Sequence, residues 1–221
     1  MSITTIDYAV PNKTHNKHDV FFHSDIIHTM ITNKPFMVDK WLSSIKPYEN
    51  NNSFLVGLDV ECLFINHSGV SPPAAVLQLY IGGECLVFQI LHASFVPKSL
   101  VAFLGNENNK FVGVGIREDM DKLLRDFSLL VVNFVDLRYL AAEKLGEKAM
   151  KSAGLKTLAL CVLDKEIEKP KKITLSDWGG FPLTVKQVQY ACVDAFISFE
   201  EITCDLGFDG GATSIDNNSQ T

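Results

Sequence analysis

Apolar residues gather in short runs in the first half of the chain, and these runs have the length of β-strands rather than of helices. We expect strands at about 54–60, 75–81 and 85–90, because each run is rich in Val, Leu, Ile or Phe. Gly82-Gly83 separates the last two runs and is typical of a tight hairpin turn. The pattern therefore predicts a meander of three antiparallel strands.

The segment before the meander is predicted to hold a hairpin and a helix. Residues 20–31 carry apolar side chains on both sides of Ser24-Asp25, which we expect to form the turn. A helix carrying Trp41 should follow Pro35, since proline suits the first turn of a helix. Residues 1–18 are mostly polar, and we expect them to be a flexible N-terminal leader.

Helical and strand patterns alternate in the second half of the chain. In order, we expect a helix near 97–105, a strand at 111–115, a helix at 118–127, a strand near 131–136, and then mostly helix to about 203. A meander followed by alternating strands and helices indicates an α/β domain with a ribonuclease H-like mixed sheet flanked by helices. We expect this domain over residues 19–207. Residues 208–221, rich in Gly, Ser and Asn, should be a disordered tail.

The last helix has the clearest start signal. Thr184 and Gln187 fit a capping box, in which each side chain bonds to the backbone N–H of the other residue. The apolar seam of the helix is predicted to comprise Val188, Cys192, Ala195 and Phe199. Tyr190 and Asp194 would then lie on the other side of the helix, outside the seam.

Composition narrows the class of protein. The 221 residues, 47% of them hydrophobic, suit one domain with a substantial core. No run approaches the roughly 18 apolar residues of a membrane span, and the N-terminus has no signal-peptide core. We therefore expect an intracellular protein of the nucleus, the cytoplasm or both, without a membrane partner. The five cysteines are widely spaced and lack a CxxC pair, which favours reduced thiols.

The charge distribution bears on nucleic-acid binding. The formal charge of −6 argues against a protein that coats nucleic acid, because phosphate binding relies on Lys and Arg. A metal-dependent nuclease is partly exempt, since bound cations reverse the local field. Residues 143–172 hold eight Lys against five acidic residues, and this stretch either contacts phosphates or forms a solvated helical face.

Carboxylates at two distant places indicate a metal site. Asp59 and Glu61 end an apolar strand and, being two residues apart, point to the same face. Tyr190 and Asp194 are four residues apart on a helix and lie one above the other. Clustered carboxylates repel one another unless hard cations such as Mg²⁺ or Mn²⁺ share them. The set is typical of a two-metal phosphodiesterase.

Three motifs in this order resemble the DEDD superfamily of 3′–5′ exonucleases, in its tyrosine-bearing branch. The motifs are Gly57-Leu58-Asp59-Val60-Glu61, then Val112-Gly113-Val114-Gly115-Ile116 with Asp119, then Tyr190-Ala191-Cys192-Val193-Asp194-Ala195. Within the superfamily the chain is most similar to Werner syndrome-like exonuclease domains and the related plant proteins. The resemblance covers about residues 20–205.

The resemblance implies both a site and an activity. Asp59, Glu61, Asp119 and Asp194 would bind two Mg²⁺ or Mn²⁺ ions, and Tyr190 would orient the attacking water. The implied reaction is hydrolysis of nucleic acid from a free 3′ end, which releases nucleoside monophosphates. DNA is the expected substrate. An RNA-trimming enzyme of the ribonuclease D kind and a catalytically silent nucleic-acid-binding or interaction module are the alternatives. The sequence holds no phosphate loop, so unwinding would need a separate helicase partner.

A few residues depart from the family pattern or leave a choice open. Cys62 stands where the family usually has Trp after the first-motif Glu. Glu118 and Asp121 flank Asp119 and could compete with it as ligands. Gln78 and Lys156 could approach the substrate strand, although structural or solvent roles are the simpler reading.

Overall fold

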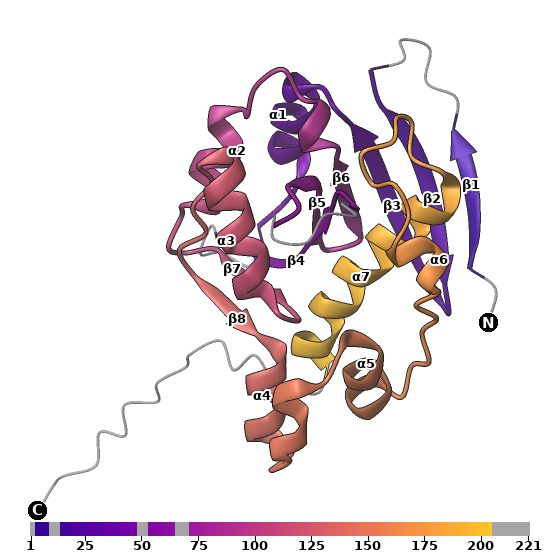
Figure 1. The fold of residues 1–221 in the computed structure, drawn as a ribbon, viewed down its shortest axis with the longest axis vertical. Helices are drawn as coiled ribbons and strands as arrows, with labels where there is room; N and C mark the ends of the chain where they lie inside the picture. Colours follow the sequence, from indigo (N-terminus) through magenta and orange to yellow (C-terminus); the bar gives the residue numbers. More distant parts are fainter. Residues whose placement is uncertain (1–2, 9–13, 48–52, 65–70, 205–221) are drawn as a thin grey trace, which may run out of the picture.

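The computed structural model describes residues 3–8, 14–47, 53–64 and 71–204 (Figure 1). In these ranges eight strands form one mixed sheet in the order β1-β2-β3-β6-β5-β4-β7-β8. The strands are β1 (Thr4–Tyr8), β2 (Asn16–Phe22), β3 (Asp25–Thr32), β4 (Leu55–Cys62), β5 (Ala74–Ile81), β6 (Glu84–Phe88), β7 (Lys110–Gly113) and β8 (Phe134–Asp136).

Seven α-helices and two short 3₁₀ helices accompany the described sheet. They are α1 (Pro35–Ser44), η1 (Ile90–His92), α2 (Lys98–Leu104), α3 (Ile116–Phe127), α4 (Leu137–Lys144), η2 (Lys148–Ser152), α5 (Leu155–Leu163), α6 (Lys171–Thr174) and α7 (Val185–Cys204).

The predicted meander and the alternation after it are confirmed. Strands β4, β5 and β6 pair antiparallel in sequence order, and Gly82 and Gly83 make the turn with φ of 53° and 98°. Strands β7 and β8 then add in parallel beside β4. The carboxyl ends of β4, β7 and β8 consequently share one edge of the sheet.

The sheet begins earlier in the chain than the sequence indicated. The expected hairpin is present as β2 and β3, with the turn one residue earlier, at His23 and Ser24. Strands β1 and β2 begin at Thr4 and Asn16, which corrects the expectation of a flexible leader over 1–18 where those residues are described. Strand β1 lies at the edge of the sheet and is largely exposed, so its polar residues hid the strand signal.

Helix α7 also ties β1 into the fold. The amide of Gln189 donates to the carbonyl of Ile3 at 3.2 Å and to the hydroxyl of Thr5 at 2.7 Å. The first strand is thus anchored to the last helix as well as to its neighbour β2.

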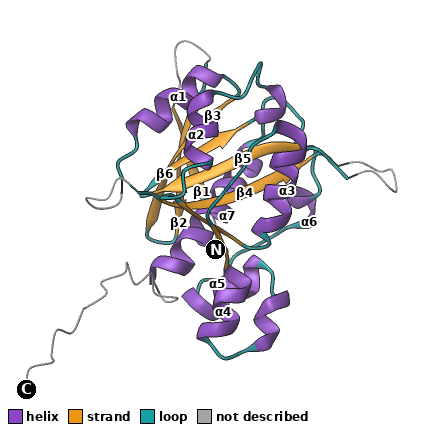
Figure 2. Ribbon diagram, turned by 90° about the vertical axis from the view of Figure 1, so that its left-hand side faces the viewer, coloured by secondary structure: helices purple, strands orange, loops and turns teal. Residues whose placement is uncertain are grey.

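The helices cover both faces of the sheet. One core lies between the sheet and helices α1, α2 and α3, which lie together on one face in Figure 2. The second core includes α4, α5 and α7 on the opposite face. Helix α7 crosses this second face and packs on β4 and β5, so it carries its side chains to the middle of the sheet (Figure 1).

Helix α7 is buried more completely than its sequence pattern suggested. All residues from Ala191 to Phe199 are buried, including Asp194, which is only 4% exposed. The expected seam is present, but the side of the helix away from it is covered as well, because α7 also packs against α5. The predicted seam is confirmed, and on the other side of the helix Asp194 is buried as well, whereas Tyr190 is half-buried.

Three remaining expectations concern composition and the chain end. Cys62, Cys85, Cys161 and Cys192 are free thiols, as expected, but of these only Cys85 and Cys192 are fully buried and Cys161 is exposed. The side chain of Cys204 lies outside the description. No helix in the described part of the chain has the length and apolar character needed to cross a membrane. The expected tail at 208–221 lies outside the described residues.

Candidate active site

Two alternate residues of β4 and one residue of α7 bring three carboxylates together. Asp59 and Glu61 share the face of β4 over which α7 lies, and Asp194 comes down from that helix. One carboxylate oxygen from each residue lies within 4.8 Å of the others. The structure therefore joins the first and the third sequence motif, which are far apart in the chain, in one cluster of oxygen ligands.

A glycine allows this close approach of helix and strand. A β-carbon built on Gly57 would lie 2.0 Å from the backbone oxygen of Ala195, far inside van der Waals contact. Gly57 stands on the same face of β4 as Asp59, two residues earlier. Helix α7 can rest directly on β4 because that position has no side chain.

The middle motif turns the chain so that Asp119 reaches the cluster. Gly113 ends β7 where a β-carbon would lie 2.6 Å from the carbonyl of Leu58, and Gly115 follows with a left-handed φ of 76°. Helix α3 starts at Ile116 directly after this turn. Asp119 in its first turn is half-buried, whereas Glu118 and Asp121 are exposed.

Asp119 lies at the border of the cluster rather than among its three closest members. Its carboxylate is 3.7 Å from the ammonium of Lys122, one turn along the helix. Lys122 is also a hydrogen-bond partner of the Cys62 thiol at the end of β4. The residue that replaces the family's usual Trp therefore contacts a cation beside the site.

The acids have strongly raised pKa values. Burial, followed by the negative charges of Asp59 and Asp194, raises the pKa of Glu61 to about 10. Burial and the charge of Asp59 raise the pKa of Asp119 to about 8. The pKa of Asp194 rises to about 7 because burial outweighs the opposing effect of the Lys169 ammonium. Burial likewise raises the pKa of Asp59. These directions are those of a site that needs added positive charge to hold its acids ionised.

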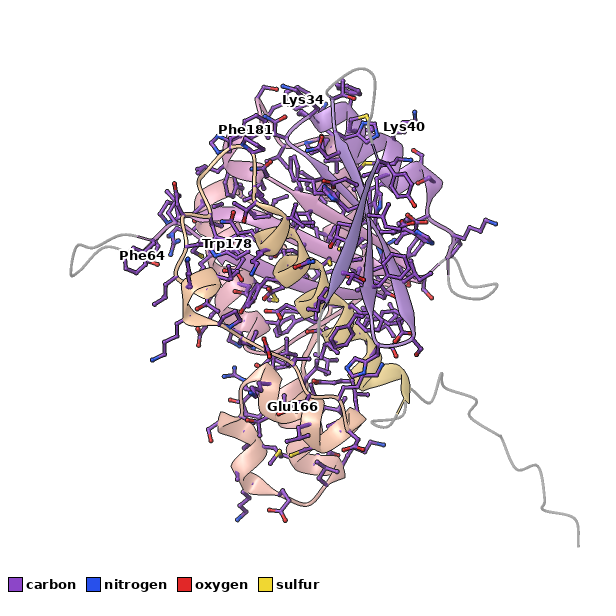
Figure 3. All side chains as sticks on the ribbon, turned by 90° about the vertical axis from the view of Figure 1, so that its right-hand side faces the viewer. Lys34, Lys40, Phe64, Glu166, Trp178 and Phe181 are labelled. Carbon is purple, nitrogen blue, oxygen red and sulfur yellow. The ribbon has the colours of Figure 1, made fainter. Side chains whose placement is uncertain are left out.

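Tyr190 joins the carboxylates through Asp194. The phenol and the Asp194 carboxylate are hydrogen-bonded, and burial together with that carboxylate raises the pKa of Tyr190. The ring packs against Trp178 with 5.9 Å between ring centres. Trp178 is itself buried and lies beside α7 in Figure 3, so its contact with the Tyr190 ring restricts the orientation of that ring.

The predicted capping box fixes the start of α7. The Thr184 N–H donates to Oε1 of Gln187 at 2.9 Å, and the Gln187 N–H donates to the Thr184 hydroxyl at 3.3 Å. The amide of Gln187 also donates to the hydroxyl of Ser176 and the carbonyl of Asp177, each at 3.0 Å. These bonds join α7 to the segment that carries Trp178.

Sequence reasoning missed the cation at the centre of the site. Lys169, in the segment before α6, places its ammonium 2.6 Å from Oδ2 of Asp194 and 5.1 Å from the centre of the Tyr190 ring. It belongs to the lysine-rich stretch, but nothing in that stretch distinguishes it from its neighbours. Lys122 could have been found, because it follows Asp119 by three positions on a helix.

Of the two residues considered for the substrate strand, one is excluded. Gln78 is 0% exposed and pairs across the sheet with Asp59, so it lies beside the carboxylates beneath α7 and cannot reach a strand. Neither of its amide atoms has a hydrogen-bond partner among the described residues. Lys156 is exposed on α5.

Comparison with known proteins agrees with this arrangement. The chain is 40% identical over 143 residues to "Bifunctional 3'-5' exonuclease/ATP-dependent helicase WRN" of Mus musculus, which covers 64% of this chain and 10% of that protein. It is 35% identical over 146 residues to "3'-5' exonuclease" of Arabidopsis thaliana, covering 65% of this chain and 50% of that one. The chain thus spans half or less of the length of these relatives.

A solved structure and a family profile extend the comparison. RNase D of Escherichia coli superposes with a TM-score of 0.61 at 18% identity, covering 76% of this chain and 41% of that chain, and so shows the same fold. Residues 31–205 match the profile of the family described as 3'-5' exonuclease. That range includes all three motifs and every carboxylate of the site, and the chain therefore belongs to the 3'-5' exonuclease family.

Proposed function

We propose that this chain is a metal-dependent 3′–5′ exonuclease domain that hydrolyses the terminal phosphodiester of a nucleic acid and releases nucleoside monophosphates. The observation that carries the proposal is the meeting of Asp59, Glu61 and Asp194 within 4.8 Å, in a chain whose residues 31–205 match the exonuclease family. DNA is the substrate that the resemblance of the three motifs implies.

Two divalent cations, Mg²⁺ or Mn²⁺, fit the donor set. The ligands are all carboxylate oxygens, which hard cations prefer. Burial and the neighbouring carboxylates raise the pKa values of Glu61 and Asp194, and a bound cation would favour their ionised forms. Asp59, Glu61 and Asp194 would hold the ions directly, and Asp119, at the border, would act through the outer shell. When bound, the ions would stabilise negative charge on the attacking and leaving oxygens of the phosphodiester.

The chain's own residues supply position and protonation. Tyr190 keeps its proton, since burial and the Asp194 carboxylate raise its pKa, so it orients a water by hydrogen bonding rather than by abstracting its proton. Trp178 holds the ring in place. The closed packing of α7 on β4 fixes the carboxylates relative to the tyrosine, which is the contribution expected of a preorganised site.

A groove beside the first turn of α3 offers a place for the substrate strand. It lies between the starts of α3 and α4 and includes Arg117, Phe134 and Tyr139 in its lining. The guanidinium of Arg117 lies 5.1 Å from the centre of the Phe134 ring, and the Tyr139 side chain is 57% exposed. An exposed aromatic ring in a groove that also contains a guanidinium suits a nucleotide base and its phosphate. Tyr139→Ala should therefore raise KM for oligonucleotides more than kcat falls.

The decisive experiment is a time course on DNA and RNA oligonucleotides labelled at the 3′ end or at the 5′ end, with Mg²⁺, Mn²⁺ or chelator. We expect a ladder that shortens one nucleotide at a time from the 3′ end, mononucleotide products, and no reaction in chelator. Asp194→Asn should be inactive under every condition. Cleavage at internal positions, or equal rates with and without metal, would contradict the proposal.

The same assay separates the alternatives. Equal strands of DNA and RNA compare the proposed activity with trimming of RNA, for which the likeness to RNase D supplies only a shared fold. Binding without hydrolysis of either strand would indicate a silent binding module. The relative from Mus musculus is named as an exonuclease and a helicase in one protein. For this domain we propose that unwinding comes from a helicase partner. Without that partner, a duplex with a blunt end should be degraded more slowly than a single strand.

A further inference from the structure

Lys169 occupies an unusual place for a lysine. It reaches into the carboxylate cluster from the segment between α5 and α6, and its side chain is 26% exposed, against 6% for Asp194. Its ammonium contacts Oδ2 of Asp194 at 2.6 Å and faces the ring of Tyr190. The next lysines in the chain, Lys171 and Lys172, are exposed.

The charges around Lys169 are those that a metal ion would meet. Burial lowers the pKa of Lys169, but the carboxylates of Asp194 and Asp59 outweigh burial, and the net effect raises the pKa. Lys169 in turn lowers the pKa values of Asp59, Glu61 and Asp194, the three residues of the cluster. One side chain therefore acts on all three candidate metal ligands.

We propose that Lys169 is the internal counter-cation of the cluster: its ammonium takes the place of a cation at Asp194 in the metal-free protein, and a divalent ion displaces it toward the substrate phosphate. This inference rests on the proposed function. A lysine and a divalent ion compete for the same carboxylate oxygen and repel each other. The Lys169 side chain keeps the displaced ammonium close to Tyr190. A phosphodiester bound next to the metal ligands would contact the ammonium there.

The proposal predicts changes of opposite sign in one variant. Lys169→Met should bind Mn²⁺ about tenfold more tightly in the absence of nucleic acid, because no ammonium has to leave. The same variant should have a lower melting temperature in chelator, since its carboxylates lose their counter-charge. At saturating Mn²⁺, its KM for a single strand should rise about threefold, because the contact between the ammonium and the substrate phosphate is lost.

Mn²⁺ titration calorimetry and thermal melting of the full chain measure these effects, with Lys171→Met as a matched exposed control and Lys169→Arg as the variant that keeps the charge. Unchanged or weaker Mn²⁺ binding by Lys169→Met would overturn the proposal.

If that variant does not fold, the wild-type protein provides the test. Acetylation of Lys169 by an amine-reactive reagent, followed by mass spectrometry against Lys171 in the same sample, should be slow in chelator and faster with Mn²⁺. Equal or slower labelling with Mn²⁺ would overturn the displacement.

The outcomes also distinguish this inference from the proposed function. A wild-type chain that neither binds Mn²⁺ nor hydrolyses any strand removes the exonuclease proposal and this one with it. A wild-type chain that binds Mn²⁺ and degrades strands from the 3′ end, while Lys169→Met binds Mn²⁺ no more tightly, removes only the role of Lys169.

Discussion

Gly57 and Ala195 lie in direct backbone contact, so close that a β-carbon on Gly57 would be 2.0 Å from the Ala195 carbonyl oxygen. The two residues flank the site: Asp59 follows Gly57 by two positions on β4, and Asp194 precedes Ala195 on α7. The distance between the two carboxylates is consequently set by a contact that only glycine allows.

Gly57→Ala should push α7 away from β4. We expect a loss of about 1–3 kcal/mol in the free energy of unfolding from overpacking, and a fall in hydrolysis of up to about 10², because small displacements of ligands are costly in catalysis. Chemical denaturation and single-strand digestion measure the two effects. Gly154→Ala is the control, since a β-carbon there meets nothing within 4 Å. Full activity of Gly57→Ala would show that the spacing of α7 is not critical.

Removing one carboxylate of the cluster should abolish hydrolysis without unfolding the chain. Asp194→Asn keeps the shape of the side chain but takes away an anionic ligand, so metal binding should weaken strongly. Mn²⁺ titration, circular dichroism and the labelled-strand assay report binding, fold and turnover. Asp59→Asn should behave alike. Normal turnover in either variant would remove the proposed site.

The three neighbouring acids of α3 should rank by their place in the structure. Asp119→Ala should reduce kcat far more than Glu118→Ala or Asp121→Ala, because Asp119 is half-buried at the border of the cluster and the other two are exposed. Steady-state kinetics on one oligonucleotide under saturating Mn²⁺ give the ranking. A larger effect at Glu118 or Asp121 would place the middle motif in another register.

Tyr190→Phe should separate the hydroxyl from the ring. The ring contact with Trp178 would persist, while the hydrogen bond to Asp194 would be lost. We expect kcat to fall by about 10², because the attacking water loses the hydroxyl that positions it, with little change in KM. Tyr190→Leu then reports the additional loss of the ring. If the Phe variant keeps the wild-type kcat, water orientation does not depend on the hydroxyl.

Glu201 should make the stability of the protein depend on pH. It is fully buried on α7, neither carboxylate oxygen has a hydrogen-bond partner in the described part of the chain, and burial raises its pKa from 4.5 to about 8. The folded protein thus binds this proton more tightly than the unfolded chain. Its contribution to stability is complete below pH 4.5 and is lost as pH rises to about 8.

Glu201→Gln keeps a neutral side chain of similar size at every pH. It should raise the free energy of unfolding at pH 8 by about 1–3 kcal/mol and leave it nearly unchanged at pH 5. Denaturation in chelator at both pH values measures the difference. The exposed Glu166 provides the control as Glu166→Gln (Figure 3). A stabilisation that does not grow with pH would mean that Glu201 is ionised throughout.

Local patterns were sufficient for the elements that carry the acids. Alternation along a strand predicted that Asp59 and Glu61 share a face, and the capping box located the start of α7. These features depend on neighbours within four positions of the chain. The sequence indicated that Asp194 and the acids of β4 share a site, but it did not show the contact at Gly57 that brings α7 so close to β4.

The features that the sequence did not reveal depend on contacts between distant segments and on burial by neighbouring elements. Lys169 meets Asp194 through an irregular segment whose path no periodicity predicts. Gln78 lies in the middle of an apolar run and is buried with it, so the approach to the substrate strand that was considered for it does not occur. Asp194 is buried although it lies outside the seam, since α7 packs against α5 as well as the sheet, and the sequence of one helix does not show which neighbours it will have.

The hydrogen bonds from Gln189 to Ile3 and Thr5 link the two ends of the described chain next to Tyr190. The polar first residues thereby become part of the scaffold that seats the tyrosine. Removing residues 1–18, as their polarity alone would suggest, deletes the outer strand of the sheet and leaves the Gln189 amide without these acceptors. A purification tag should accordingly not replace the first strand.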